Sequence, residues 1–413
     1  MPVFLKSIYV SQCRNLTDFK IPISESSRRH LILTGRNGSG KTSLLDEINK
    51  FLLGLFAGSG LISNLNANRT AMKSSLASLS QPSLTEKEKL AHRNDIEKFR
   101  SRIEQNFGSC ELEFSDEIGL EQKLNKGTFL LAYFGAKRIA QVQAPTGINI
   151  VRLPLRSGPN SHDNAKFLQY IVNLKADRSF ARDDGKLEEA IKIDEWFLHF
   201  TEQLRTIFGA SELRLEFDRS KYSFNIVIPG LKPFGFNELS DGYSAFMSIV
   251  TELLLRMEAH GNQRKTYDME GIVLIDEIET HLHVDLQKKI LPFLTAVFPN
   301  IQFVISTHSP FVLSSIGNAV ICDLEKRFIT EDLSGYSYDA LIESYFESDK
   351  YSYELKGRLA EYEELISESK PSYEHQERLL VLQRYFDAVP KQFGPELAVR
   401  LQQIQLALLN GAK

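Results

Sequence analysis

Three short apolar runs stand out in the pattern of hydrophobic and polar positions: RHLILTG at 29–35, GIVLIDE at 271–277 and IQFVISTH at 301–308. Each is a block of Ile, Leu, Val and Phe with turn or charged residues beyond it. This pattern is typical of strands buried on both faces of a mainly parallel sheet, although a buried helix segment is the alternative for any single run. Because a stretch with helical spacing follows each run, the pattern predicts a doubly wound α/β fold.

Other segments alternate apolar and polar residues, which indicates strands with one exposed face. These are CELEF, TFLLAYFG, and the pair LRLEF and YSFNIVI, which predicts an antiparallel β subdomain. Helical spacing marks the polar segment 63–106, the region 163–208 and the tail beyond 323. We therefore expect a two-part head with a helical insertion, a helical lobe and a helical C-terminal tail. The expected parts are 1–62 and 209–322 for the two halves of the head, 63–106 for the insertion, 107–208 for further head strands with the lobe, and 323–413 for the tail.

Composition narrows the class of protein. The 413 residues carry a formal net charge of -4, which argues against an overall basic coat for nucleic acid but leaves a local basic groove open. Cys13, Cys110 and Cys322 are scattered, as expected for reduced thiols. The first residues lack a signal peptide's apolar core, and the early apolar stretch 44–56 contains charged residues, so we expect a cytoplasmic protein and no membrane span. The mixed charges of the insertion favour a solvated helical hairpin over a DNA-binding arm.

The first run leads directly into a complete GxxxxGK[ST] motif that opens a predicted helix. Its glycines allow backbone N–H groups to curl around a phosphate, and the helix N-terminus adds partial positive charge. We expect Lys41 to neutralise the β- and γ-phosphates and Thr42 to bind Mg²⁺. The candidate nucleotide-binding residues here are Gly35, Arg36, Asn37, Gly38, Ser39, Gly40, Lys41, Thr42 and Ser43.

The other two apolar runs end in candidate catalytic side chains. Asp276 and Glu277 close the second run, at the edge of the sheet where open α/β folds bind ligands. We expect Asp276 to hold Mg²⁺ and Glu277 to act as general base for a water molecule. His308 ends the third run and is a candidate hydrogen-bond donor to a γ-phosphate. Solvated carboxylates and a capping histidine are the alternatives.

A second phosphate-binding element, FNELSDGYSAF, lies far along the chain at 236–246. A phosphate loop, a distant Leu-Ser-Xaa-Gly, an Asp-Glu strand and a His strand, in this order, resemble the ABC-type ATPases of the Rad50, RecF, SMC and OLD-like branch. The N-terminal segment is also similar, with Arg14 and Asn15 at a turn expected to approach the nucleotide. In that family, the Leu-Ser-Xaa-Gly element contacts the γ-phosphate bound by another protomer. The resemblance therefore implies that Ser240 and Gly242 complete the ATP site of a second copy, in a head-to-tail homo-oligomer of at least two chains. An N-capping Ser and a turn Gly are the alternative reading.

The sequence departs from transport ATPases in three places. Asp241-Gly242-Tyr243 replaces the usual Gly-Gly-Gln, and His283 stands where transporters and SMC proteins have Asp. This second feature resembles OLD, RecF-like and anti-phage ATPases, and makes His283 a candidate nucleotide contact. No clear glutamine loop is present; AYFGAKR occupies its place, so Lys137 or Arg138 is expected to face the nucleotide.

The resemblance implies a Mg²⁺-dependent ATPase with slow turnover. The helical tail is similar to those of stand-alone defence ATPases such as the PARIS and Septu subunits, each of which works with a separate nuclease. The tail itself shows no metal-binding nuclease pattern, since Glu331-Asp332 lie in a Ser- and Tyr-rich context that favours a solvated helix. We therefore expect a sensor or regulatory scaffold for a separate effector, a nuclease, in anti-phage defence. A DNA-repair or chromosome clamp that binds nucleic acid directly is the alternative; a transporter ATPase is disfavoured.

Overall fold

The computed structural model describes residues 2–57, 61–79, 84–138, 143–259, 268–338, 341, 353–367, 372–388 and 401. The chain forms two compact units, Met1–Tyr336 and Ser337–Lys413. In the second unit, helices α11 (Tyr353–Ser367) and α12 (Tyr373–Ala388) pack through a small apolar cluster that includes Tyr362 and Phe386. The predicted helical tail thus has two described helices, and most of its other residues beyond 338 lie outside the described residues.

The first unit is built on a six-stranded sheet with the order β12-β11-β3-β10-β9-β5. Five neighbouring strands are parallel and β12 pairs antiparallel with β11, which confirms the predicted mainly parallel sheet. The strands are β3 (His30–Thr34), β5 (Phe129–Phe134), β9 (Glu270–Ile275), β10 (Ile301–Ser306), β11 (Ala319–Asp323) and β12 (Phe328–Glu331). Every residue of β3 and β10 is buried, as their continuous apolar sequences require.

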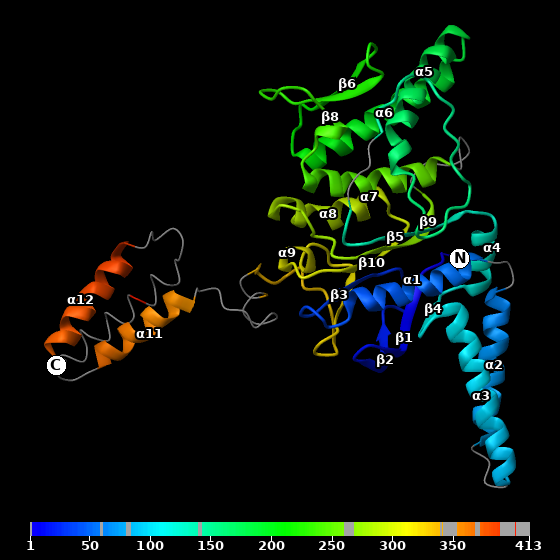
Figure 1. Cartoon of the computed structure of the whole chain (residues 1–413). Helices are drawn as coiled ribbons and strands as arrows, with labels where there is room; N and C mark the ends of the chain where they lie inside the picture. The colour runs from blue at the N-terminus through cyan, green and yellow to red at the C-terminus, as the bar shows by residue number, and fades with distance from the viewer. Residues whose placement is uncertain are drawn as a thin grey trace. The chain divides into compact units, whose positions relative to one another are not determined.

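Helices and a second sheet cover the two faces of this sheet (Figure 1). On one side lie α1 (Lys41–Ala57) and the antiparallel sheet of β1 (Leu5–Cys13), β2 (Leu16–Pro22) and β4 (Cys110–Phe114), which share one apolar core with alternate residues of the parallel strands. On the other side lie α7 (Asp241–Glu258), α8 (Val284–Val297) and the short α9 (Pro310–Leu313).

Two further parts extend from the head (Figure 1). Helices α2 (Leu61–Leu79) and α3 (Glu86–Phe107) pack together as a largely exposed arm, and a capping box between Thr85 and Glu88 fixes the start of α3. Short helix α4 (Glu117–Asn125) follows β4. The helical lobe contains α5 (Phe167–Asp183) and α6 (Leu187–Phe208), and the predicted hairpin forms β6 (Arg214–Asp218) and β7 (Ser223–Val227), with β8 (Phe234–Gly235) beside it.

The structure differs from the expected boundary at 323. Strand β11 ends at Asp323, whose Oδ1 accepts the N–H groups of Glu325 and Lys326, and the tight turn returns the chain as β12. The compact unit therefore runs to Tyr336, beyond the predicted boundary. Glu331 ends a strand and Asp332 lies in a turn with φ 53°, so the helix predicted around these carboxylates is absent there. The acidic, Tyr-rich composition of this region suggested a helix, and the short edge strand β12 was therefore not predicted.

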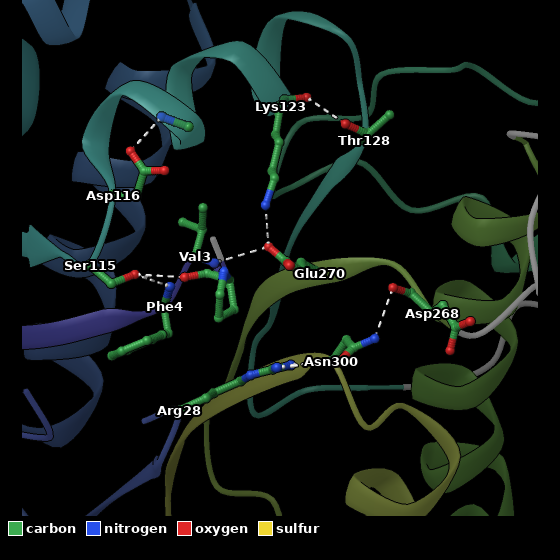
Figure 2. Close-up of polar contacts among 12 residues, drawn as sticks. Val3, Phe4, Arg28, Ser115, Asp116, Lys123, Thr128, Asp268, Glu270 and Asn300 are labelled. Carbon is green, nitrogen blue, oxygen red and sulfur yellow. Dashed lines mark hydrogen bonds and ion pairs between the residues drawn. The ribbon is translucent and has the colours of Figure 1, made fainter. Parts of the chain in front are cut away.

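Polar contacts fix the amino edge of the sheet (Figure 2). Glu270, the first residue of β9, accepts hydrogen bonds from the Val3 N–H at 3.0 Å and from Lys123 Nζ at 2.6 Å. Arg28 donates to Asn300 Oδ1 at 3.2 Å, just before β10. The phosphate loop, Asp276, Glu277 and His308 lie at the opposite, carboxyl edge.

Among the described residues no single helix is long and apolar enough to cross a membrane; only α1 and α2 taken together, across a sharp bend, pass that test.

Candidate functional site

The loop between β3 and α1 is shaped as an open cradle. Gly38 and Gly40 have φ angles of +85° and +100°, which side-chain-bearing residues rarely adopt. No heavy atom lies within 4 Å of the place that a Cβ would take at either glycine. The loop therefore leaves room beside its backbone, and its residues fit a bound phosphate group.

Lys41 lies at the start of α1 with only 5% of its surface exposed. Its Nζ donates to the carbonyl oxygens of Gly35 at 2.8 Å and Arg36 at 3.1 Å, so the side chain folds back over the loop. Burial lowers the pKa of Lys41, and the nearby carboxylates of Glu277 and Glu279 oppose that effect. The ammonium group is thus held where an anion in the loop would meet it.

Asp276 joins the phosphate loop to the next strand. Its Oδ1 accepts from Thr42 Oγ1 at 3.3 Å and from Ser306 Oγ at 2.6 Å. Ser306 Oγ in turn accepts the N–H of Glu277 at 2.7 Å. A hydroxyl and a carboxylate oxygen side by side suit Mg²⁺, which is commonly held by one or two protein oxygens together with phosphate and water. The donors at Thr42 and Asp276 therefore fit the predicted metal.

Glu277 lies in the left-handed region with φ 45°, a costly conformation for a residue with a side chain. Close to it, Glu279 accepts hydrogen bonds from Thr307 Oγ1 at 2.7 Å and from the His308 N–H at 2.5 Å. Burial, followed by the charge of Lys41, lowers the pKa of His308, so the neutral imidazole is favoured at neutral pH. The structure thus brings Lys41, Asp276, Glu277 and His308 to one edge of the sheet.

Arg138 does not face a nucleotide as expected. Its guanidinium is buried and donates to the backbone carbonyls of Gly135, Asp276, Glu277 and Ile278. The neighbouring Lys137 is exposed. The correction has a simple cause: the chain turns after β5 toward the end of β9, the adjacent strand, whose carbonyls lie within reach.

The Leu-Ser-Asp-Gly element lies at the start of α7, in a different place from the phosphate loop. Ser240 is exposed and occupies the N-cap position of α7, but its side chain makes no capping hydrogen bond and is left pointing to the surface pocket that it lines. A surface pocket of about 560 Å³ brings Ser240, Gly242 and His283 together. Its other lining residues are Ile207, Phe208, Asp241, Tyr243, His281, Asp285, Leu286 and Lys289, so no phosphate-loop residue contributes.

Gly242 is buried directly against the turn that follows Glu277. A Cβ at Gly242 would lie 2.7 Å from the carbonyl oxygen of His281, too close for any side chain to fit without movement. His281 itself has φ 66°. The start of α7 and the turn 277–283 are therefore packed backbone to backbone.

The predicted N-terminal contacts lie beside the phosphate loop. Arg14 and Asn15 form the exposed turn between β1 and β2, and Arg14 has φ 51°. The Asn15 carbonyl accepts from Arg327 at 3.0 Å. In the same turn as Arg327, Glu325 accepts the N–H of Arg36 at 3.2 Å. These contacts link the β1–β2 turn to the phosphate loop through the β11–β12 turn.

The motif order and this geometry agree with a comparison against known families. The family model described as "AAA domain, putative AbiEii toxin, Type IV TA system" matches residues 31–314, more than half of the chain. The chain belongs to this AAA-domain family. The match contains the phosphate loop, the Leu-Ser-Asp-Gly element, the Asp-Glu strand and His308, and it supports the expected resemblance to ABC-type ATPases.

Curated relatives of this AAA-domain protein include a Septu protein and a retron ATPase. It is 37% identical to the Septu protein PtuA of Bacillus mycoides (strain KBAB4) over 117 residues, which are 26% of this chain and 16% of that protein. It is 24% identical to the Retron Vc95 probable ATPase of Vibrio cholerae serotype O1 biovar El Tor over 370 residues, which are 75% of this chain and 72% of that protein. Among solved structures, it is similar to the SMC head domain from Thermotoga maritima with 15% identity and a TM-score of 0.34, covering 77% of this chain and 94% of that one.

The structure shows three residues that contact the predicted catalytic groups and that the sequence of this AAA-domain protein did not identify in that role: Ser306, Glu279 and Arg138. Ser306 and Glu279 lie in motifs that were singled out, ISTHSP and IDEIETHLH, and a strand-end hydroxyl and a carboxylate two residues after Glu277 were usable signals. Arg138 carried no such signal, because its partners are backbone carbonyls 138 or more residues away, apart from Gly135.

Proposed function

We propose that the chain is a Mg²⁺-dependent ATP phosphohydrolase whose active site is completed by a second copy arranged head-to-tail. One observation carries this proposal. The phosphate loop lies with Asp276, Glu277 and His308, whereas the exposed Ser240 lines a pocket to which no phosphate-loop residue contributes. In this proposal the phosphate-loop group of one chain and the Ser240 pocket of a second chain together form one ATP site.

The residues divide the work as follows. The N–H groups of the phosphate loop and Lys41 bind the triphosphate. Thr42 and Asp276 would hold Mg²⁺, which when bound would offset the charge of the phosphate oxygens. Glu277 orients a water molecule and accepts its proton as the water oxygen attacks the γ-phosphorus. The bond from that phosphorus to the β–γ bridging oxygen breaks, and ADP leaves. The neutral imidazole of His308 donates to a γ-phosphate oxygen.

The second copy supplies the remaining donors. Ser240 Oγ and the N–H groups at the start of α7 are placed at a helix N-terminus, which favours an anion. Gly242 lets this helix start pack against the turn 277–283 of its own chain. His283, in the same pocket as Ser240, is the candidate further contact to the neighbour's nucleotide.

The test compares ATP-driven association and hydrolysis in three forms of the full chain, by light scattering and phosphate release. Wild type should hydrolyse ATP with Mg²⁺. Glu277→Gln should accumulate as an ATP-bound oligomer, because binding is intact and the general base is removed. Ser240→Arg should bind ATP as a monomer and neither associate nor turn over. Rapid turnover by Glu277→Gln, or normal association of Ser240→Arg, contradicts the proposal.

We also propose that ATP-driven association controls a separate effector, a nuclease, in anti-phage defence. The similarity to a Septu protein and to a retron ATPase supports this role. The test is coexpression with the product of the neighbouring reading frame. Nuclease activity that differs between wild type and Lys41→Ala supports effector control. Salt-dependent DNA binding by the ATP-bound chain alone would favour the clamp alternative instead.

A further inference from the structure

Arg138 is a buried cation whose hydrogen bonds to described residues all go to backbone carbonyls. Its guanidinium donates to Gly135 O at 3.1 Å, Asp276 O at 2.5 Å, Glu277 O at 2.8 Å and Ile278 O at 3.3 Å. Only 5% of the residue is exposed. Three consecutive carbonyls of the turn after β9 are therefore held by one side chain.

The same turn is held from its other side by β10. Ser306 Oγ accepts the N–H of Glu277 at 2.7 Å, and the Ser306 carbonyl accepts the N–H of Ile278 at 3.1 Å. Arg138 takes the carbonyls and Ser306 takes the N–H groups, so the peptide units around Glu277 are fixed in both directions. This double restraint explains how Glu277 keeps its costly left-handed conformation.

A stabilising role alone does not account for an arginine here. Within the described residues, the carboxylates of Glu279, Asp276 and Glu277 act on Arg138 only through longer-range attraction, and its Nε is buried without a hydrogen-bond partner. Burial lowers the pKa of Arg138 to about 10, against the longer-range attraction of Glu279, Asp276 and Glu277. A buried cation without a paired charge is costly, and the hydrogen bonds to the four carbonyls are what offset that cost. We therefore look for the function of the guanidinium in the backbone carbonyls that it holds in place.

We propose that Arg138 is a positioning residue for hydrolysis: by clamping the carbonyls of residues 276–278, it aims the Glu277 carboxylate at the attacking water. This inference rests on the proposed ATPase function and assigns Arg138 no contact with the nucleotide. It requires that loss of the clamp reduces the chemical step and leaves ATP binding unchanged.

The test uses the full chain with Arg138→Lys and Arg138→Met. Lysine keeps the charge but its single ammonium lacks the planar fork that reaches several carbonyls, and methionine keeps much of the volume. A misplacement of about 1 Å at a catalytic group costs up to about 100-fold in rate, so we expect kcat to fall about 10- to 100-fold. The Kd for ATP should stay within about twofold of wild type, because the phosphate loop is untouched.

A double-mutant comparison separates positioning from general damage. Under single-turnover conditions, Arg138→Lys should slow hydrolysis in the wild-type background and have no further effect in the Glu277→Gln background, because it acts through Glu277. Arg256→Lys is the matched control. Arg256 is also buried and donates to the carbonyls of Leu131, Gly158 and Ser161, away from the turn; unlike Arg138, it also pairs with a carboxylate, Glu252 Oε1, at 2.6 Å. It should lower the melting temperature and leave kcat near wild type.

The outcomes are distinct. Wild-type kcat in Arg138→Lys, or an equal loss of rate in both backgrounds, overturns the inference while the proposed function stands. Loss of ATP binding in Arg138→Lys also overturns it, because Arg138 would then serve the nucleotide site. If Arg138→Met fails to fold, Arg138→Lys decides alone. A wild-type chain without ATPase activity refutes the proposed function and this inference together.

Discussion

Gly242→Ala tests how closely the start of α7 packs against the turn that carries the catalytic glutamate. The substitution adds one methyl group at the second position of the helix. The new Cβ would lie 2.7 Å from the His281 carbonyl oxygen. That oxygen belongs to a turn braced by hydrogen bonds from Thr280 N–H to Glu277 O and from Leu282 N–H to Glu279 O, both at 2.9 Å. The turn therefore has little freedom to retreat.

Two opposing effects set the size of the change. Replacing glycine by alanine within a helix is expected to stabilise it by up to about 1 kcal/mol. The contact is about 0.7 Å short of ordinary van der Waals distance, and forcing an extra methyl into a packed site costs about 1–3 kcal/mol. We expect the steric cost to win, with a net loss of about 1 kcal/mol in local stability and weaker ATP-driven association.

Hydrogen exchange measures the local stability of each helix separately, so it can detect the gain from helix propensity and the loss from the steric contact. Gly357→Ala is the matched control: Gly357 lies in α11, is exposed, and has no heavy atom near its would-be Cβ. Its amides should gain protection, whereas those at the start of α7 should lose protection in Gly242→Ala. Equal gains in the two variants, with unchanged ATP-driven association of Gly242→Ala, would refute the steric reasoning.

Three further predictions follow from the site and the core. Lys41→Ala should abolish ATP binding while the melting curve stays cooperative, because the ammonium over the loop is lost; ATP affinity close to wild type by calorimetry would contradict the phosphate-loop assignment. Ser306→Ala should cost about 1–3 kcal/mol in urea unfolding, because it leaves the Asp276 carboxylate and the Glu277 N–H short of a buried partner; an unchanged midpoint would count against this. His30 is 7% exposed, its Nδ1 accepts the Phe303 N–H, and burial lowers its pKa to about 4. The unfolded chain therefore takes up a proton below pH 6.5 that the folded chain refuses, so stability should fall by up to about 3 kcal/mol between pH 6.5 and pH 4. His30→Asn, which keeps an acceptor, should lose this part of the pH dependence; an identical acid slope in both proteins would show that His30 is not responsible.

Local patterns predicted those parts of the fold that local forces determine. Strands β3, β9 and β10 were readable because their apolar residues are continuous, and the phosphate loop because its glycines and Lys41 stand at fixed spacing. The sequence pattern did not predict the hairpin of β11 and β12. The edge strand β12 has only four residues and an exposed Phe328, so it lacks the buried face that would produce a regular apolar pattern. The edge strand β12 pairs with β11, and β11 in turn pairs with β3 from the start of the chain.

The site divides in the same way. Asp276, Glu277 and His308 were identified because they directly follow predicted strands, and parallel sheets bind ligands at the carboxyl ends of their strands. The roles of Arg138 and Gly242 depend on contacts with backbone atoms distant in sequence. Every residue has a backbone carbonyl, so the sequence does not indicate which carbonyls make such contacts. A glycine required by another turn's carbonyl looks, in isolation, like any glycine at a helix start.

The position of β3 between β10 and β11 has a consequence for synthesis on the ribosome. The strand that carries the phosphate loop is made early, yet both of its sheet neighbours are encoded beyond residue 300. At roughly 5–20 residues per second, the ribosome needs about 13–50 seconds to cover that stretch. During this time β3, with Leu31, Ile32 and Leu33 at its centre, lacks both of the strands that flank it in the finished sheet, which makes it a candidate for chaperone binding. Nucleotide can be held only after nearly the whole head has been translated, so a prematurely terminated chain stays inert.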